Sequence, residues 1–152
     1  MAAKERKPKP QNATSPSENA KVAEVTTTGY AIQLETRELN KTDLATVLRT
    51  LTAGLQRRLG SQVQLVMLYG SHARGEARPE SDVDLFVVLR RGSAADYDKV
   101  RQVAYQVMWD ANFSYVFSLY LTDVQHYEAL EEHGSSFLRN VQREGKVLWR
   151  AT

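Results

Sequence analysis

The sequence predicts an α/β (α+β) fold in which a small mixed β-sheet is backed by helices. Two observations lead to this prediction. Two short apolar runs with β-branched residues, 63–69 and 83–89, are typical of buried strands. Segments with the apolar spacing of helices flank them, over 44–59 and from residue 94 to about residue 110. This order of elements predicts a two-layer domain.

Length and composition predict one folded domain. The chain has 152 residues, of which 42% are hydrophobic and 25% charged, which is ordinary usage for a globular protein. It has no cysteine, which excludes disulfides, thiolate zinc sites and cysteine nucleophiles. No run reaches the roughly 18 to 20 apolar residues of a membrane span, and the amino terminus lacks the apolar core of a signal peptide, so we expect a cytoplasmic protein without a membrane partner. The net charge of +2 is too small to indicate a nucleic-acid binder.

We expect residues 1–37 to form an N-terminal tail and linker and residues 38–152 to form the domain. From Met1 to about Lys21 there are hardly any apolar side chains, so this stretch cannot bury enough surface to offset the entropy of ordering and is predicted to be disordered. Residues 22–35 combine β-branched residues with a Thr-Thr-Thr-Gly run, which fits a strand, a hairpin arm or an extended linker equally well.

The first helix and the two strands after it have clear boundaries. Leucines recur at spacings of three and four and predict an amphipathic helix that ends at Gly60. These residues are Leu44, Leu48, Leu51, Leu55 and Leu59. The strand over 63–69 ends at Gly70, and Ser93 follows the second strand as the N-cap of a helix that runs to about Asp110.

The C-terminal part alternates between strand and helix signals. Apolar residues at every second position over 113–121 predict a third, half-buried strand. Thr122 and Gln125 have the spacing of a capping box for a further helix. Ser135 or Ser136 then begins a last helix that stops at Gly145, and residues 147–149 close the chain as an apolar segment.

The segment from residue 68 to residue 85 has the residue types of a phosphate and metal site. Gly70 and Ser71 follow a buried strand, where glycine lets the backbone turn sharply and approach a ligand, and Ser71 adds a hydroxyl donor. Asp82 and Asp84 stand at the start of the next strand and point to the same face, about 6.6 to 6.8 Å apart along it. Two carboxylates at this spacing can hold a magnesium ion that also contacts substrate phosphates. Like charges on one strand face repel each other, so the pair needs a reason. Metal binding is one, and the alternative is a solvated strand entrance with two exposed acids.

Residues 70–85 resemble the G-S-x-x-R-G and S-D-x-D-L signature of minimal nucleotidyltransferases, a branch of the DNA polymerase β superfamily. The match comprises Gly70, Ser71, Arg74, Gly75, Ser81, Asp82, Asp84 and Leu85. A looser similarity runs from about Leu44 to Trp149 and includes a Phe-Leu-Arg-Asn stretch at 137–140 and the Glu144-Gly145 pair. The resemblance implies a polymerase β-type fold and a metal-dependent nucleotidyltransferase.

The resemblance also implies a role for each matching site residue. Gly70, Ser71, Arg74 and Ser81 would contact the phosphates of ATP or another nucleoside triphosphate, and Asp82 and Asp84 would be the catalytic magnesium ligands. Arg74 has an alternative role as a structural partner of Glu76 or Glu80.

Two features depart from the family pattern. Active relatives bring a third carboxylate from the next strand, but the stretch 113–121 contains no acid, and the nearest candidates are Asp110 and Asp123. The second basic residue that often follows Gly-Ser is His72 here. The resemblance therefore implies an alternative, which is a weak or inactive nucleotidyltransferase-fold protein that acts as an antitoxin or binding subunit for a HEPN-type partner. A homo-oligomer is a further possible assembly.

Other residues have simpler interpretations. We interpret His126 and His133 as exposed surface histidines, because no third ligand with suitable spacing accompanies them. Trp109 and Trp149 each end an apolar stripe or run, so we expect them to pack in the core rather than to stack on a nucleobase.

Overall fold

The computed structural model describes residues 24–27, 30–33 and 43–152. The chain divides into two units, Met1–Leu39 and Asn40–Thr152. In the first unit, β1 (Glu24–Thr27) pairs with β2 (Tyr30–Gln33) as an antiparallel two-stranded sheet. The stretch for which the sequence allowed strand or linker thus contains two strands. The predicted disorder of residues 1–21 lies outside the described residues.

The second unit is built on a four-stranded sheet with the order β5-β4-β3-β6. Its strands are β3 (Val63–Tyr69), β4 (Val83–Leu89), β5 (Phe117–Asp123) and β6 (Lys146–Arg150). The central strand β3 is antiparallel to both β4 and β6, whereas β4 and β5 are parallel. The sheet is therefore mixed, which confirms the predicted fold class.

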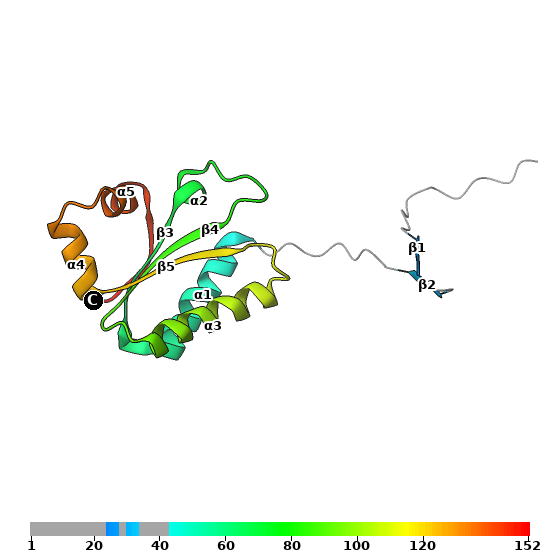
Figure 1. Cartoon of the computed structure of the whole chain (residues 1–152), viewed down its shortest axis with the longest axis horizontal. Helices are drawn as coiled ribbons and strands as arrows, with labels where there is room; N and C mark the ends of the chain where they lie inside the picture. The colour runs from blue at the N-terminus through cyan, green and yellow to red at the C-terminus, as the bar shows by residue number, and fades with distance from the viewer. Residues whose placement is uncertain (1–23, 28–29, 34–42) are drawn as a thin grey trace, which may run out of the picture. The chain divides into compact units, whose positions relative to one another are not determined.

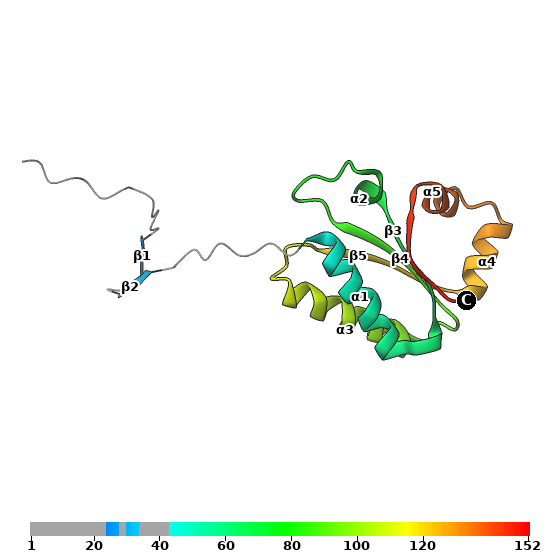
Figure 2. The ribbon, with the colours of Figure 1, turned by 180° about the vertical axis from the view of Figure 1, so that it is seen from behind.

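Helices cover both faces of this sheet (Figure 1). The helices α1 (Leu44–Leu59) and α3 (Ala94–Asp110) lie on one face, and α4 (Val124–Glu132) and α5 (Ser136–Glu144) lie on the other, as the view from behind also shows (Figure 2). The 3₁₀ turn Gly60–Gln62 links α1 to β3, and the short helix α2 (Gly70–Arg74) follows β3. The sequence predicted two layers, one of strands and one of helices. The structure has a second helical layer, because α4 and α5 cover the other face of the sheet.

The core consists of two apolar clusters, one on each face of the sheet. The larger cluster joins α1 and α3 to one set of strand residues, and the smaller cluster joins α5 to the other set. Along β4, Leu85 and Val87 belong to the larger cluster, and Phe86 and Val88 belong to the smaller one. Because strand side chains alternate, Asp84 points to the same face as Phe86, which is the face that α4 and α5 cover.

The third strand begins later than its alternating pattern predicted. Asn112 and Phe113 have φ values of 49° and 53°, which is left-handed backbone, and the N–H of Phe113 donates to the carbonyl of Met108 over 2.7 Å. These residues make a turn after α3, so β5 starts at Phe117 rather than at residue 113 and runs on to Asp123. The strand is also packed on both faces, since Leu119 contacts the larger cluster and Tyr120 the smaller one.

The predicted capping box at Thr122 is wrong. Thr122 belongs to β5 and is 2% exposed, and the N-cap of α4 is Asp123, whose carboxylate accepts from the backbone N–H of His126 over 2.9 Å. The strand continues two residues further than the pattern suggested, which moves the cap along the chain. Ser135 caps α5 as predicted, and Gly145 ends it.

The prediction of core packing is confirmed for Trp149 and wrong for Trp109. Trp149 lies in β6 and packs against the larger cluster. Trp109 is 59% exposed, because the residues of α3 that face the sheet are Val100, Ala104 and Val107, and Trp109 lies outside that stripe.

Candidate active site

The turn after β3 brings the backbone of Gly70 against the carboxylate of Asp84. Gly70 has a φ of 69°, and a Cβ atom at this position would collide with the side chain of Asp84. Glycine is therefore required twice, once for the left-handed backbone and once for the close approach. The turn continues directly into α2, which ends at Gly75 with a φ of 76°.

The two predicted metal ligands lie at the start of β4, Asp84 within the strand and Asp82 just before it. Asp84 is opposite Tyr69 in the antiparallel register and is half-buried, whereas Asp82 just precedes the strand and is exposed. Within residues 43–152, neither carboxylate has a hydrogen bond or ion pair to a protein group. Their oxygens are thus available to an external ligand.

Tyr69 contributes a protonated hydroxyl beside this pair. Burial, followed by the negative charges of Asp84 and Tyr120, raises the pKa of Tyr69 above its ordinary value of 10.0. The phenol therefore stays neutral at physiological pH and can donate a hydrogen bond.

On β5, the residue next to Asp84 is Ser118 rather than an acid. It is the direct neighbour of Asp84 in the parallel register, so both side chains point to the same face. Asp123 is the neighbour of Leu89, five positions further along the strands and thus about 17 Å from Asp84. Asp110 ends α3 and accepts a hydrogen bond from Gln106 over 2.8 Å. In the described part of the chain, no cluster of three or more His, Cys, Asp or Glu residues could hold a metal ion.

Arg74 is held by two carboxylates at the end of α2. Its Nε donates to Glu76 over 2.8 Å, and its Nη1 donates to Glu144 of α5 over 3.1 Å. These bonds, to Glu76 first and then to Glu144, raise the pKa of Arg74 above its ordinary value. Of the two structural partners considered from the sequence, the structure has Glu76 rather than Glu80.

Glu144 is a site residue that sequence reasoning did not single out. It accepts from Arg143 over 2.6 Å as well as from Arg74, and hydrogen bonds from these two residues, in that order, lower the pKa of Glu144 below 4.5. The carboxylate ties α2 to α5, two segments that are 70 positions apart. Its place in the Glu144-Gly145 pair was a sequence signal, but the contact with Arg74 depends on the tertiary fold.

Ser81 and His72 shape the loop that carries Asp82. The hydroxyl of Ser81 accepts from the backbone N–H of Arg78 over 2.9 Å, and the backbone N–H of Ser81 returns a bond to the carbonyl of Arg78 over 3.0 Å. The Nε2 atom of His72 lies 3.1 Å from the carbonyl oxygen of Ser81. The loop before β4 is therefore held to α2.

Two small cavities lie in this region, one lined by Gly70 and the other by Asp82. One of about 210 Å³ lies between α2 and α5 and contacts Gly70 and Arg74 on one side and Asn140 and Glu144 on the other. The second, of about 180 Å³, lies between residues 79–82 and 113–116 and includes Asp82.

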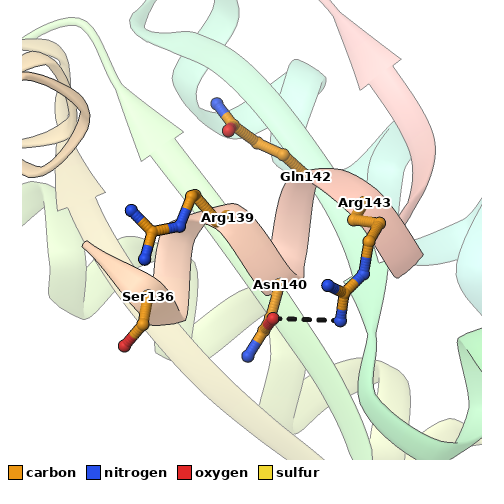
Figure 3. A pocket seen from close by; sticks show the side chains of 5 residues that line it. All are labelled: Ser136, Arg139, Asn140, Gln142 and Arg143. Atoms are coloured by element: carbon orange, nitrogen blue, oxygen red, sulfur yellow. Dashed lines mark hydrogen bonds between the residues drawn. The ribbon is translucent and has the colours of Figure 1, made fainter. Parts of the chain in front are cut away.

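A larger hollow is lined by residues other than the two aspartates. It measures about 570 Å³, and the described residues that line it are polar side chains of α5, where Arg143 donates to Asn140 over 3.1 Å (Figure 3). Asn140 also lines the cavity beside Gly70. We assign the candidate site to the Gly70 turn with Asp84 and to Asp82, because one of the smaller cavities is lined by Gly70 and the other by Asp82.

Two further predictions concern histidines and membrane segments. His126 and His133 are exposed, as predicted, and Nδ1 of His133 lies 2.6 Å from the carbonyl oxygen of Ala129. Among the helices of the described residues, none has both the length and the apolar character to cross a membrane.

Comparison with known proteins identifies one matching family. The family model described as polymerase beta, nucleotidyltransferase matches residues 50–152. This range contains Gly70, both aspartates, Arg74 and Glu144. No curated protein matches the sequence.

Three of the similar solved structures are complexes of a toxin with an antitoxin. One contains AMP-PNP and is 20% identical over 67% of this chain and 73% of the other, with a TM-score of 0.44. A second, a mutant MntA-HpeT complex, is 17% identical over 69% and 74%, with a TM-score of 0.45. A third, the tri-AMPylated HEPN toxin of Shewanella oneidensis with its MNT antitoxin, is 17% identical over 71% and 74%, with a TM-score of 0.40.

Proposed function

Because the chain belongs to the polymerase beta nucleotidyltransferase family, we propose that it transfers a nucleotidyl group from ATP or another nucleoside triphosphate to an acceptor hydroxyl. The observation that carries this proposal is the contact of the Gly70 backbone with the Asp84 carboxylate. It puts a turn suited to phosphate next to an acid suited to a metal. Only glycine tolerates an approach this close. The approach is useful if a phosphate group and a metal ion have to bind next to each other at this turn.

The residues present fit a magnesium ion. Magnesium takes oxygen ligands and is commonly held by one or two carboxylates together with substrate phosphates and water. Asp82 and Asp84 offer two carboxylates, separated by one residue, to which no described protein group is hydrogen-bonded. The bound ion would neutralise phosphate charge during transfer. Asp82 and Asp84 would hold it, and Ser118 beside Asp84 offers a hydroxyl rather than a third carboxylate.

The protein groups around the turn would hold the triphosphate. Ser71 follows Gly70 at the start of α2 and offers a hydroxyl donor, and Arg74 keeps its Nη2 outside the two ion pairs that fix its other nitrogens. Tyr69 adds a neutral phenol on the face of Asp84. In the reaction, the acceptor oxygen bonds to the α-phosphorus, the bond between the α and β phosphates breaks, and pyrophosphate leaves. The hydroxyl proton passes to water, since the register places Ser118 and not an acid next to Asp84.

One observation favours a second candidate function. With a serine beside Asp84 and no third acid assembled among the described residues, the site has fewer groups to activate an acceptor than the family pattern implies. The alternative is a nucleotide-binding antitoxin or subunit for a HEPN-type protein, with weak or no turnover. In this case the Asp pair would still bind metal and nucleotide.

Calorimetric titration of ATP with magnesium separates these possibilities. We expect magnesium-dependent binding by the native chain and its loss in an Asp82→Asn, Asp84→Asn double variant, because the ion loses both carboxylates. Asp98→Asn is the matched control, since Asp98 is an exposed acid of α3 paired with Arg101. Absence of binding in the native chain would refute the proposed site. Binding without pyrophosphate release, with a panel of hydroxyl acceptors, would support the binding-subunit alternative.

A further inference from the structure

Arg74 is held by carboxylates on two of its nitrogens, which leaves the third nitrogen for a ligand. Its Nε donates to Glu76 over 2.8 Å, and its Nη1 donates to Glu144 over 3.1 Å. Within residues 43–152, its Nη2 has no hydrogen bond to a protein group. A guanidinium presents its N–H groups in one rigid plane, so fixing two nitrogens also fixes the direction of the third. The two glutamates therefore orient the nitrogen that remains for a phosphate oxygen.

Of the two glutamates, Glu144 is the better anchor. The side chain of Glu76 is 65% exposed and lies only two residues from Arg74, so solvent screens its charge and it shares the backbone support of Arg74 itself. The side chain of Glu144 is 28% exposed and belongs to α5. Arg143 donates to its other oxygen over 2.6 Å, so both carboxylate oxygens of Glu144 have partners. Glu144 can thus place Arg74 relative to a separate element of the fold.

The backbone beside Glu144 is packed against the strand that leads to the glycine turn. Gly145 follows Glu144, and a Cβ atom on Gly145 would approach the carbonyl oxygen of Leu68 to 3.2 Å, which is tighter than ordinary van der Waals contact. Lys146 is the register partner of Leu68, which stands two positions before Gly70. The strand β3 therefore supports both the turn and Glu144. Support of this kind on a rigid element is what accurate placement of a binding group requires.

The charges of this network leave phosphate binding to Arg74. The positive charges of Arg74 and Arg143 balance the negative charges of Glu76 and Glu144, so the network has no net charge to attract a triphosphate. What it can offer is a correctly aimed N–H group, and hydrogen bonds between charged partners are about twice as strong as those between neutral ones. Arg74 lines the cavity of about 210 Å³ together with Gly70, which puts the guanidinium beside the turn.

We propose that Glu144 is a positioning residue that directs the Nη2 atom of Arg74 toward the phosphates of the bound nucleotide. The inference rests on the proposed nucleotidyl transfer and adds to it the residue that orients the phosphate-binding arginine. Arg74 then has both roles considered from the sequence, because its ion pairs serve its contact with phosphate. Glu144 acts through Arg74 and does not itself touch the nucleotide.

A double-mutant cycle on the affinity for magnesium ATP tests this proposal. Binding to the full chain is measured by calorimetry, with displacement of a fluorescent ATP analogue for weak binders, in Glu144→Gln, Arg74→Gln and the double variant. Glu131→Gln is the matched control, because Glu131 of α4 also holds α5, through Gln142 over 3.0 Å, and has no bond to Arg74 among the described residues. Denaturant unfolding measures the stability of every variant.

We expect Glu144→Gln to lower the affinity of the native chain by at least about fivefold, which is within the range of coupling between groups of one network. In the Arg74→Gln background the same substitution should change the affinity by less than about twofold, because no guanidinium remains to be oriented. Glu131→Gln should leave the affinity within about twofold of the native value.

A second background keeps the cycle measurable if Arg74→Gln abolishes ATP binding. Arg74→Lys keeps the positive charge but lacks the fork that two carboxylates and a phosphate can share. In this background too, Glu144→Gln should change the affinity by less than about twofold.

Several results would overturn the positioning role and leave the proposed function standing. They are an unchanged affinity in Glu144→Gln, an equal loss in the native chain and in the background that lacks Arg74, and an equal loss in Glu131→Gln. The last result would mean that loosening α5 is sufficient. Absence of magnesium-dependent ATP binding by the native chain would refute the proposed function and this inference together.

Discussion

Gly70 shows how one residue can decide a site. Its missing side chain leaves room for the carboxylate of Asp84, and its φ of 69° requires a left-handed backbone. The sequence motif pointed to a glycine turn near phosphate, but the contact with Asp84 follows from the pairing of β3 with β4, in which Tyr69 faces Asp84. Residue types were therefore predictable here, and their mutual contact was not.

We predict that Gly70→Ala damages both the fold and the site, whereas Gly75→Ala damages the fold alone. Gly75 has a similar φ of 76°, but a Cβ atom there would have no neighbour within 4 Å, so alanine meets only backbone strain of about 1 to 2 kcal/mol. Gly70→Ala adds a collision that displaces Asp84, and we expect magnesium-dependent ATP affinity to fall by about tenfold or more, equivalent to about 1.4 kcal/mol. Denaturant unfolding and calorimetry measure the two effects. Equal ATP affinity in both variants would contradict the role of the close contact.

The ion pairs of Glu144 should make the site sensitive to low pH. Its pKa is lowered by Arg143 and Arg74, so the charged form is favoured in the folded state. A lowered folded pKa contributes stability that is present above the ordinary value of 4.5 and is lost as pH falls through the folded value. The connection of α2 to α5 should therefore weaken in acid.

We predict that Glu144→Gln flattens the dependence of the melting temperature on pH below 4.5. The native chain should lose melting temperature more steeply than the variant in this range, although a slope remains because Asp43 and Asp96 also have lowered pKa values. Glu128→Gln on the exposed side of α4 is the control and should follow the native curve. Parallel curves for the native chain and Glu144→Gln would mean that the pairs with Arg74 and Arg143 contribute nothing in solution.

At the scale of elements, local signals predicted most boundaries. The leucine spacing of α1, the apolar runs of β3 and β4, and the serine caps of α3 and α5 are properties of neighbouring residues, and the structure has these elements where they were expected. The predicted start of β5 was wrong because the alternation of apolar residues continues through a turn. Asn112 and Phe113 create this turn with their left-handed backbone. The predicted N-cap of α4, Thr122, was wrong for a related reason. Parallel pairing with β4 extends β5 to Asp123.

The N-cap of α5 offers a test with a neighbouring control. The hydroxyl of Ser135 accepts from the backbone N–H of Leu138 over 3.3 Å, whereas Ser136 is the first residue of the helix and points outward (Figure 3). We predict that Ser135→Ala lowers the free energy of unfolding by about 0.5 to 2 kcal/mol. Ser136→Ala should change it by less than about 0.5 kcal/mol, because alanine is a good helix residue. Equal effects in denaturant unfolding would contradict the assignment of the cap.

At the scale of the whole molecule, the sheet separates a structural face from a face that carries the site. The larger cluster with α1 and α3 lies on one side, and Asp84, Ser118 and the smaller cluster lie on the other. Periodicity predicted which residues are buried, but neither the strand order nor the helices on the second face could be read from it. The position of Ser118 beside Asp84, and the distance of Asp123 from it, follow from that order.

Because the site lies on one face of the sheet, we predict that two core substitutions with similar losses of stability differ in their effect on nucleotide binding. Phe86 is fully buried two positions after Asp84 and stacks on Tyr120 at 5.1 Å, whereas Leu55 is fully buried in α1 on the opposite face. We expect about 3 to 5 kcal/mol of lost stability for Phe86→Ala and about 2 to 5 kcal/mol for Leu55→Ala. Measured well below both melting temperatures, magnesium-dependent ATP affinity should fall in Phe86→Ala, because the cavity relaxes beneath Asp84. It should be nearly unchanged in Leu55→Ala, since the intact sheet lies between that cavity and the site. Equal affinity losses would mean that the sheet transmits packing defects from one face to the other and that the site depends on the whole core.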